Sequence, residues 1–141
     1  MSVLARAALL LLCVCSKAFA TEEDDARDAA RRMIEARRAE GFLNISAQRR
    51  GVLDEKGKDA FPVTMVAGSE YLAAVAGDKE LLELELLLVD SDRSYKILRR
   101  DKGSAVSFTF TPKSTGRHIF FLRALKGSGA FHFYLATKKE G

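Results

Sequence analysis

Acidic side chains form the one group in this chain whose spacing could do chemistry. Four of them stand in short polar stretches between apolar runs, at Asp78, Asp90, Asp92 and Asp101. Calcium takes about six to eight oxygen ligands from carboxylates and carbonyls, and loops from several strands can meet at one end of a sandwich. These aspartates are the candidate ligands of a calcium site. The favoured interpretation is that they only accept hydrogen bonds from the backbone of their own turns, so that no cofactor is expected.

Residues suited to catalysis are few. After residue 20 the chain has two histidines, His118 and His132, and no cysteine. The zinc-protease His-Glu-x-x-His, the hydrolase Gly-x-Ser-x-Gly and the phosphate-binding Gly-x-x-x-x-Gly-Lys patterns are all missing. His118 is in phase with Phe120 and Leu122, which predicts a buried, hydrogen-bonded histidine, and His132 alternates outward. We expect no enzyme, with a small secreted hydrolase as the less favoured alternative.

A second kind of site is suggested by apolar side chains opposite the expected core. Leu87, Ile119, Phe121 and Tyr134 alternate with inward-facing residues on their strands. Exposed aliphatic and aromatic side chains gathered on one face mark a binding surface, on which Phe121 and Tyr134 would stack against a ligand. The favoured alternative is that an N-terminal helix covers this face, as helices cover half-buried sheets.

The elements that must position these residues are organised around Leu82–Asp90. Its leucines at 82, 84, 86 and 88 alternate with Glu83, Glu85 and Leu87, and period two indicates a strand with one buried face. We expect it to be a central strand. About eight short strands are predicted in all, over residues 42–45, 61–65, 71–75, 82–90, 95–98, 106–111, 118–125 and 130–137.

This strand pattern predicts an antiparallel, jelly-roll-like β-sandwich and not an α/β fold. Residues 61–65 and 71–75 are expected to form a hairpin through Ala67-Gly68-Ser69. The predicted core collects the inward positions of these strands: Val63, Met65, Tyr71, Ala73, Val75, Leu82, Leu84, Leu86, Leu88, Val106, Phe108, Phe110, Phe120, Leu122, Phe131, Phe133 and Leu135.

An N-terminal helix is predicted over residues 21–41. Thr21 suits the N-cap, acids fill the first turn, arginines follow toward the other end, and Gly41 suits the C′ position. The apolar side of this helix is narrow and rich in alanine. We expect it to dock onto its own sandwich, since an isolated helix of this length is marginal in water, with docking onto another protein as the alternative.

The first 20 residues are typical of a secretory signal peptide. Arg6 precedes the apolar run 7–14, and Ala18-Phe19-Ala20 is a small-x-small cleavage pattern. We therefore expect a secreted or periplasmic protein, cut after Ala20, with no membrane span afterwards. The expected organisation is a signal peptide at 1–20, a helix at 21–41 and a β-sandwich domain at 42–141.

Charge and cysteine content narrow the class of protein further. Both cysteines lie within residues 1–20, so the mature domain must be held together by core packing alone. Removal of the signal peptide leaves 21 basic and 19 acidic residues. This balance argues against nucleic acid as a partner, because nucleic-acid binding needs a clustered positive surface.

The order of motifs resembles the bacterial pre-peptidase C-terminal (PPC) type of domain, over roughly residues 51–137. The matching motifs are Ala67-Gly68-Ser69-Glu70-Tyr71, Ala76-Gly77-Asp78, Leu82-Glu83-Leu84-Glu85-Leu86 with Val89-Asp90, Phe108-Thr109-Phe110-Thr111-Pro112, and Thr115-Gly116-Arg117-His118. The resemblance implies an exported jelly-roll sandwich that is non-catalytic and accessory to another molecule. Relatives of this type assist secretion, bind polysaccharide or matrix, or hold calcium.

Together these features predict a non-catalytic exported module for binding or envelope association, with a protein or polysaccharide partner. The alternative within this class is a calcium- or carbohydrate-binding accessory domain. At Glu83 and Glu85 the chain departs from the aspartates common in the family pattern, and at His118 from its tyrosine.

Overall fold

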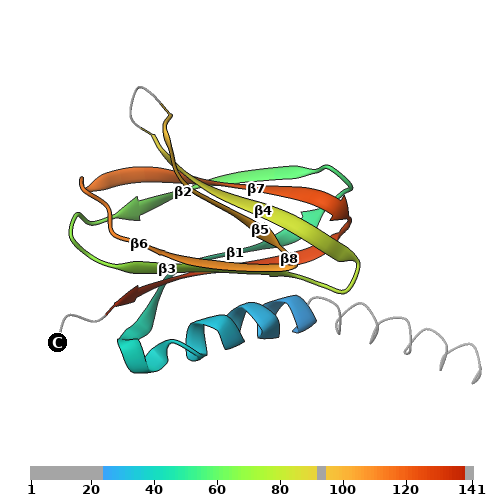
Figure 1. Cartoon of the computed structure of the whole chain (residues 1–141), viewed down its shortest axis with the longest axis horizontal. Helices are drawn as coiled ribbons and strands as arrows, with labels where there is room; N and C mark the ends of the chain where they lie inside the picture. Colours follow the sequence, from blue (N-terminus) through green and yellow to red (C-terminus); the bar gives the residue numbers. More distant parts are fainter. Residues whose placement is uncertain (1–23, 92–94, 139–141) are drawn as a thin grey trace, which may run out of the picture.

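The chain folds into two four-stranded antiparallel sheets packed face to face, with one helix on the outside (Figure 1). The computed structural model describes residues 24–91 and 95–138. The expected signal peptide, Thr21 and Asp92 lie outside the described residues. The predicted fold class, a mainly-β sandwich of eight strands with one N-terminal helix, is confirmed.

The first sheet, sheet A, has the strand order β1-β8-β3-β6, and the second, sheet B, has the order β2-β7-β4-β5. Sheet A consists of β1 (Phe42–Leu53), β3 (Tyr71–Gly77), β6 (Ala105–Phe110) and β8 (Gly129–Lys138). Sheet B consists of β2 (Lys58–Met65), β4 (Leu81–Asp90), β5 (Ile97–Gly103) and β7 (Gly116–Gly127). The expected central strand, β4, does lie between two neighbours, β7 and β5.

The predicted hairpin between residues 61–65 and 71–75 is wrong. β2 pairs with β7, whereas β3 lies between β8 and β6, so the chain crosses from sheet B to sheet A at Ala67–Ser69. The crossing is held by the backbone N–H of Val66, which donates to the Tyr71 hydroxyl at 2.8 Å. β1 continues through Gly51, and β5 includes Asp101 and Gly103.

The core between the sheets contains nearly every residue predicted for it. Phe110 is only partly buried, and Leu82 is wrong, because its side chain is 62% exposed. Two register shifts between β4 and β7, at Leu81–Glu83 and Glu83–Leu84, interrupt the alternation, and Leu81 is buried instead. A bulge of this kind moves a side chain to the opposite face of its strand.

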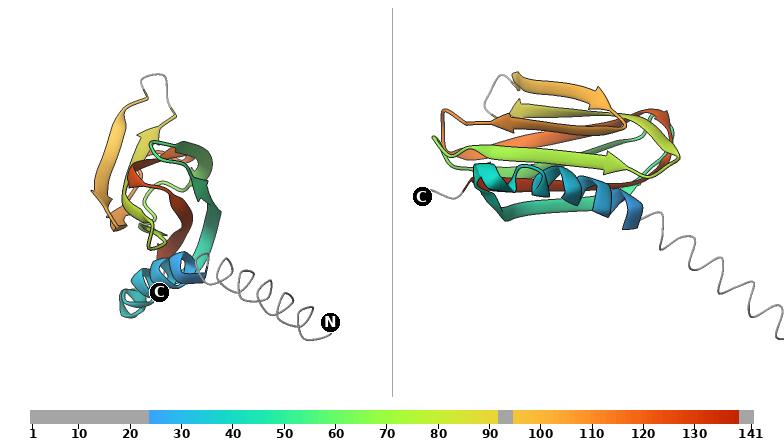
Figure 2. Two further views of the ribbon diagram at one scale, coloured as in Figure 1. Left: turned by 90° about the vertical axis from the view of Figure 1, so that its right-hand side faces the viewer. Right: turned by 60° about the horizontal axis from the view of Figure 1, so that its bottom comes forward.

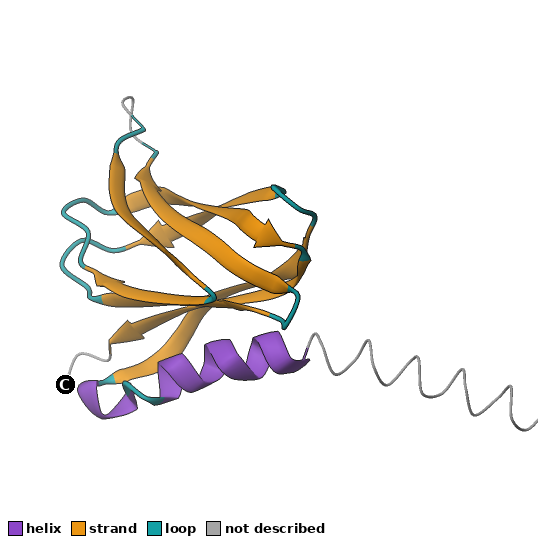
Figure 3. Cartoon of the chain, turned by 45° about the vertical axis from the view of Figure 1, so that its right-hand side comes forward, coloured by secondary structure: helices purple, strands orange, loops and turns teal. Residues whose placement is uncertain are grey.

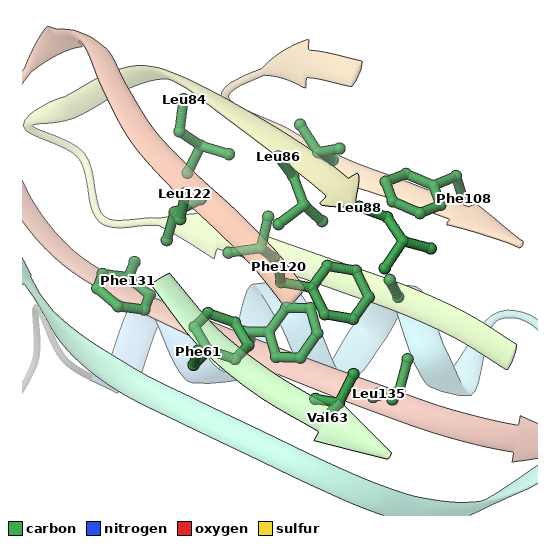
Figure 4. Close-up of a cluster of buried hydrophobic side chains, with 14 of the residues drawn as sticks. Phe61, Val63, Leu84, Leu86, Leu88, Phe108, Phe120, Leu122, Phe131 and Leu135 are labelled. Atoms are coloured by element: carbon green, nitrogen blue, oxygen red, sulfur yellow. The ribbon is translucent and has the colours of Figure 1, made fainter. Parts of the chain in front are cut away.

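Aromatic rings join the two sheets at the centre of this core (Figure 4). The Phe120 ring from β7 lies 4.8 Å, between centroids, from the Phe133 ring of β8, and Phe61 of β2 lies 4.9 Å from the same Phe133. Such tilted and edge-on contacts add to the stabilisation by apolar burial. This domain is packed around aromatic side chains in the way expected of a sandwich with no disulfide.

The N-terminal helix, described over residues 24–35, lies against the outer face of sheet A (Figures 1 and 3). After a turn it continues as the short 3₁₀ helix η1 (Arg38–Glu40) and stops at Gly41, whose φ of 106° is the left-handed conformation that glycine accepts readily. The expectation that the helix docks onto its own sandwich is confirmed. Within the described residues, no helix has the length and apolar character needed to span a membrane.

Candidate binding surfaces

The outer face of sheet A is sealed by the helix. Ala30 and Ile34 of the helix pack on outward-facing side chains of β3 and β8, chiefly small ones. Small residues let a helix backbone approach a sheet closely, so that little space remains between the layers. The sheet residues in this contact are Leu72, Ala74, Ala76, Tyr134 and Ala136, with Phe42 of β1 at the margin.

Tyr134, which we predicted to belong to an exposed binding surface, lies beneath this helix. Its side chain points away from the core between the sheets, as expected, but only 4% of it is exposed. Its ring stacks on His132, with centroids 4.5 Å apart, and the Arg31 guanidinium lies 5.9 Å from the ring centroid. The inclusion of Tyr134 with Leu87, Ile119 and Phe121 in one surface is therefore wrong, because these three lie on the other sheet.

The outer face of sheet B, which we call the open face, carries those three residues. None of the elements in residues 24–91 and 95–138 covers it, and the helix lies on the opposite side of the sandwich (Figure 2). The favoured expectation that the helix would cover Leu87, Ile119 and Phe121 is thus wrong. The reason is that the alternation in a strand shows which residues share a face but not which face the helix will select.

Cross-strand neighbours divide the open face into three rows. Directly opposed residues share a face, so the register sets the rows without ambiguity. The first is apolar, the second mixed and the third charged, in the orders Ile97-Val89-Ile119-Pro62, Arg100-Leu87-Phe121-Ala60 and Lys102-Glu85-Arg123-Lys58. Phe121 is 37% exposed and Ile97 is 47% exposed, so these two side chains reach solvent, whereas Val89 between Ile97 and Ile119 is only 5% exposed.

Glu85 anchors the charged row. Its carboxylate lies 2.7 Å from Arg123 Nη2 and 3.8 Å from Arg100 Nε. Although Glu85 alternates with the leucines of the core, it is itself buried, with only 7% of the residue exposed. These two arginines cover Glu85 and form, with Lys58, Leu87 and Phe121, a shallow hollow on the open face.

Sequence reasoning missed the members of the open face other than Leu87, Ile119 and Phe121. Val89 could have been found from the sequence, because it continues the alternation of Glu83, Glu85 and Leu87. Ile97 could not, since a register shift between Leu88 and Val89 decides where it lies. Arg100 could not be found from the sequence either, because its position beside Leu87 depends on the pairing of β4 with β5.

Asp78, the first of the candidate calcium ligands, is used by the backbone. Its Oδ1 accepts the N–H groups of Glu80 and Leu81, at 2.9 and 3.1 Å, and its Oδ2 accepts the N–H of Ala130 at 2.8 Å. The residue is 8% exposed. A Cβ at Gly129 would lie 2.2 Å from Oδ1, so glycine is required there. Asp78 thus ties the β3–β4 turn to the start of β8.

The described members of the candidate calcium site are not gathered. Asp78 precedes β4 and Asp90 ends it, a separation of roughly 30 Å at about 3.3 Å per residue. Asp101 is opposite Leu86, midway along β4. Among residues 24–91 and 95–138, no three His, Cys, Asp or Glu side chains are grouped to hold a metal ion. Asp92 lies outside these ranges, so calcium binding at this candidate site stays an untested hypothesis.

Both histidines are buried and have polar partners. His118 is 3% exposed, and its Nδ1 lies 3.1 Å from the Gly116 carbonyl oxygen, as expected of a hydrogen-bonded core histidine. His132 points outward from the core but is buried beneath the helix, with Nε2 3.3 Å from Gln48 Oε1. Burial, together with Arg27, Arg50 and Arg31, lowers the pKa of His132 from its usual value.

Comparison with known proteins places the chain by fold. No family model and no curated protein sequence matches it. A PPC domain of Bacillus anthracis collagenase aligns with 66% of this chain and 90% of its own, at 11% identity and a TM-score of 0.55. The chain therefore has a PPC-like β-sandwich fold, and the resemblance seen in the sequence is confirmed at that level.

Other solved structures share the same architecture. Aeromonas hydrophila PliG, a periplasmic inhibitor of g-type lysozyme, has a TM-score of 0.55 at 10% identity, with 67% of this chain and 87% of that chain covered. The Yersinia pseudotuberculosis-derived mitogen has a TM-score of 0.56 at 13% identity, with 70% and 89% covered. At such identities the likeness shows the fold alone.

Proposed function

We propose that this chain is an exported, non-catalytic binding module whose open face docks a protein partner. One observation carries the proposal: the chain's own helix seals the outer face of sheet A, while the equivalent face of sheet B keeps apolar side chains in contact with water. On that open face Phe121 is 37% exposed, next to Leu87 and in line with Ile119. An apolar patch with a charged border is the usual composition of a protein interface.

The composition of the open face favours a protein over a polysaccharide. Sugar-binding platforms depend on aromatic rings that stack on sugars, and Phe121 is the only aromatic residue in the three rows. Arg100 and Arg123 at the border already form ion pairs with Glu85, so they are held in place before a partner arrives. Arginine and aromatic side chains, phenylalanine among them, are enriched in protein interfaces.

Two other parts of the proposal, export and the lack of catalysis, are supported by different observations. The leader-like residues 1–20 support export, and one of the fold neighbours, the Aeromonas lysozyme inhibitor, is a periplasmic protein. Against catalysis, the hydrogen bonds of the two histidines described above go to a backbone carbonyl and an amide side chain, whereas a catalytic base needs a nucleophile or a water within reach.

A site-specific photo-crosslink would test the proposal in the organism that makes the protein. A photoreactive phenylalanine analogue replaces Phe121 in one variant and Ser107, which is exposed on β6 of sheet A, in the control. We expect one discrete protein adduct from position 121 and none from position 107. Adding Ile119→Asp to the first variant should abolish the adduct, because a charge is placed in the apolar row.

Two results would overturn the proposal. The first is an absence of protein adducts at position 121, or equal adducts at both positions. The second comes from co-sedimentation with insoluble polysaccharides, such as cellulose, chitin and peptidoglycan sacculi. Pelleting of the wild type but not of Phe121→Ala would assign the open face to a glycan.

A further inference from the structure

A groove runs between the helix and the edge strand β1, on the side of the sandwich away from the open face. The helix packs on β3 and β8, while β1 has a hydrogen-bonded neighbour, β8, on one side only. Most residues of β1 between Phe42 and Leu53 are exposed. Two hollows lie along this flank, one at each end of the helix. We call them together the helix–β1 groove.

The hollow near the C-terminal end of the helix is apolar. Ile34 and Phe42, both buried, line it together with Leu43 and Ile45 of β1. Leu43 is 46% exposed and Ile45 is 48% exposed. Aliphatic side chains of this size on an edge strand are a liability in water, since edge strands usually carry charges that discourage association. Their exposure here is a first indication that something covers them.

Arginine side chains line both hollows of the groove. Arg31 and Arg38 line the apolar hollow, and Arg27 and Arg50 line the hollow at the other end, near the buried His132. Within the described part of the chain, Arg31, Arg38 and Arg50 have no carboxylate within ion-pair distance, whereas Arg27 pairs with Asp24 at 3.2 Å. Asp24 and Glu35 are the two acids in the lining. Among the described residues, the lining therefore holds more positive than negative side chains.

We infer that the helix–β1 groove binds an extended, acidic peptide segment of a partner protein. An aliphatic side chain of that segment fills the hollow beside Leu43 and Ile45, and its carboxylates face Arg31 and Arg50. Ile45 and Arg50 of β1 lie opposite Ala136 and His132 of β8, an advance of about 13 Å at roughly 3.3 Å per residue, which an extended segment of four or five residues spans. This surface is separate from the open face, so the inference goes beyond the proposed function.

The distribution of charge favours a peptide over other occupants. A fatty acid has one carboxylate at the end of an apolar chain, whereas the arginines here lie at both ends of the groove. A second copy of the chain would place this basic surface against an identical one, and like charges brought together oppose association. An extended peptide can carry an apolar side chain for the hollow beside Leu43 and Ile45 together with several carboxylates for the arginines at the two ends.

Selection from a random peptide library displayed on phage, against protein purified after expression of the full chain, tests this inference. We expect the enriched sequences, each about twelve residues long, to contain several Asp or Glu residues and at least one Leu, Ile or Val. A selected peptide is then labelled with a fluorophore. Its dissociation constant should be at least tenfold higher for the double variant Arg31→Gln/Arg50→Gln than for the wild type. It should also rise with salt, because the contacts are charged and near the surface.

The helix provides a matched control in Arg32→Gln. Arg32 neighbours Arg31 in sequence but lines a different hollow, with Asp25, Ala29 and Asp78. Arg32→Gln removes one positive charge, as each single substitution in the double variant does, and we expect less than a twofold change in affinity. Ile45→Ser, at a 48% exposed position, tests the apolar hollow without touching charge and should weaken binding severalfold.

Several results would overturn the inference. Failure to enrich acidic sequences, or equal losses in Arg32→Gln and the double variant, would show that no peptide site lies in this groove. Competition by dodecanoate would assign the groove to a free amphiphile. Binding to phosphatidylglycerol vesicles that is lost in the double variant would assign it to a membrane surface.

Discussion

The two outer faces of this sandwich share one strand geometry and differ in what covers them. On sheet A the outward positions are mostly small, at Ala74, Ala76 and Ala136, and the helix lies directly on them. On sheet B the outward positions hold Leu87 and Phe121 with large charged neighbours, and no described element lies over them. One face is part of the folded core, and the other meets solvent.

Side-chain size accounts for this difference. A helix whose own contact residues are Ala26, Ala30 and Ile34 needs a flat surface on which its backbone can come close. The alanines of β3 and β8 provide that surface, whereas Arg100 and Arg123 would hold a helix away from sheet B. The small residues of sheet A therefore contribute to stability, and the larger ones of sheet B are available for recognition.

The largest expected effect comes from placing a charge under the helix. Ala74→Glu, at a position with no exposed surface, should lower the free energy of unfolding by about 3–5 kcal/mol, because the carboxylate would be buried without a partner. Phe121→Glu on the open face should cost about 1 kcal/mol or less. Urea unfolding of both variants measures the contrast, and equal losses would refute the division between a structural and a free face.

A comparison of two buried carboxylates should give the next largest effect. Asp78→Asn removes an acceptor from a carboxylate that binds three backbone N–H groups, and we expect a loss of about 2–3 kcal/mol. Glu85→Gln should cost about 1 kcal/mol or less, because Arg123 and Arg100 are largely exposed. Chemical denaturation distinguishes them, and a larger loss for Glu85→Gln would contradict this ranking.

The covered face should also show a modest dependence on pH through His132. Burial and nearby arginines lower its pKa in the folded state, so the unfolded chain binds more protons as the pH falls below about 6.5. The stability associated with His132 is thus fully present above pH 6.5 and is lost as the pH falls through the folded-state pKa. Unfolding free energies measured from pH 7.5 to 5.5 should decline less steeply in His132→Gln than in the wild type. Identical slopes would show that His132 does not respond to its surroundings as proposed.

The smallest effect is expected from calcium. Asp78 is occupied by backbone donors and lies far along β4 from Asp90, so millimolar calcium added after chelation should shift the melting temperature by less than about 1 °C. A site with a dissociation constant near 10 µM would instead add about 2.7 kcal/mol at a hundredfold excess. A shift of several degrees with calcium, and none with magnesium, would establish a site and justify substituting Asp90 and Asp92.

Much of the sandwich could be predicted from the sequence, because the information is local. Alternation with period two placed Leu84, Leu86 and Leu88 in the core, and the phase of His118 relative to Phe120 placed its ring inside. Gly41 was recognisable as the end of a helical segment, since a left-handed residue there is usually glycine. Each of these inferences depends on a few neighbouring residues.

The candidate surfaces could not be predicted in the same way, because they depend on contacts between distant segments. The pairing of β2 with β7 and not with β3, the bulge that buries Leu81 in place of Leu82, and the burial of Tyr134 under the helix are all set by such contacts. An alternating strand specifies two faces but not its neighbours. The amino-acid sequence alone therefore determined which residues of a regular strand share a face, and the tertiary structure decided where bulges break that alternation, which face the helix covers and which face meets solvent.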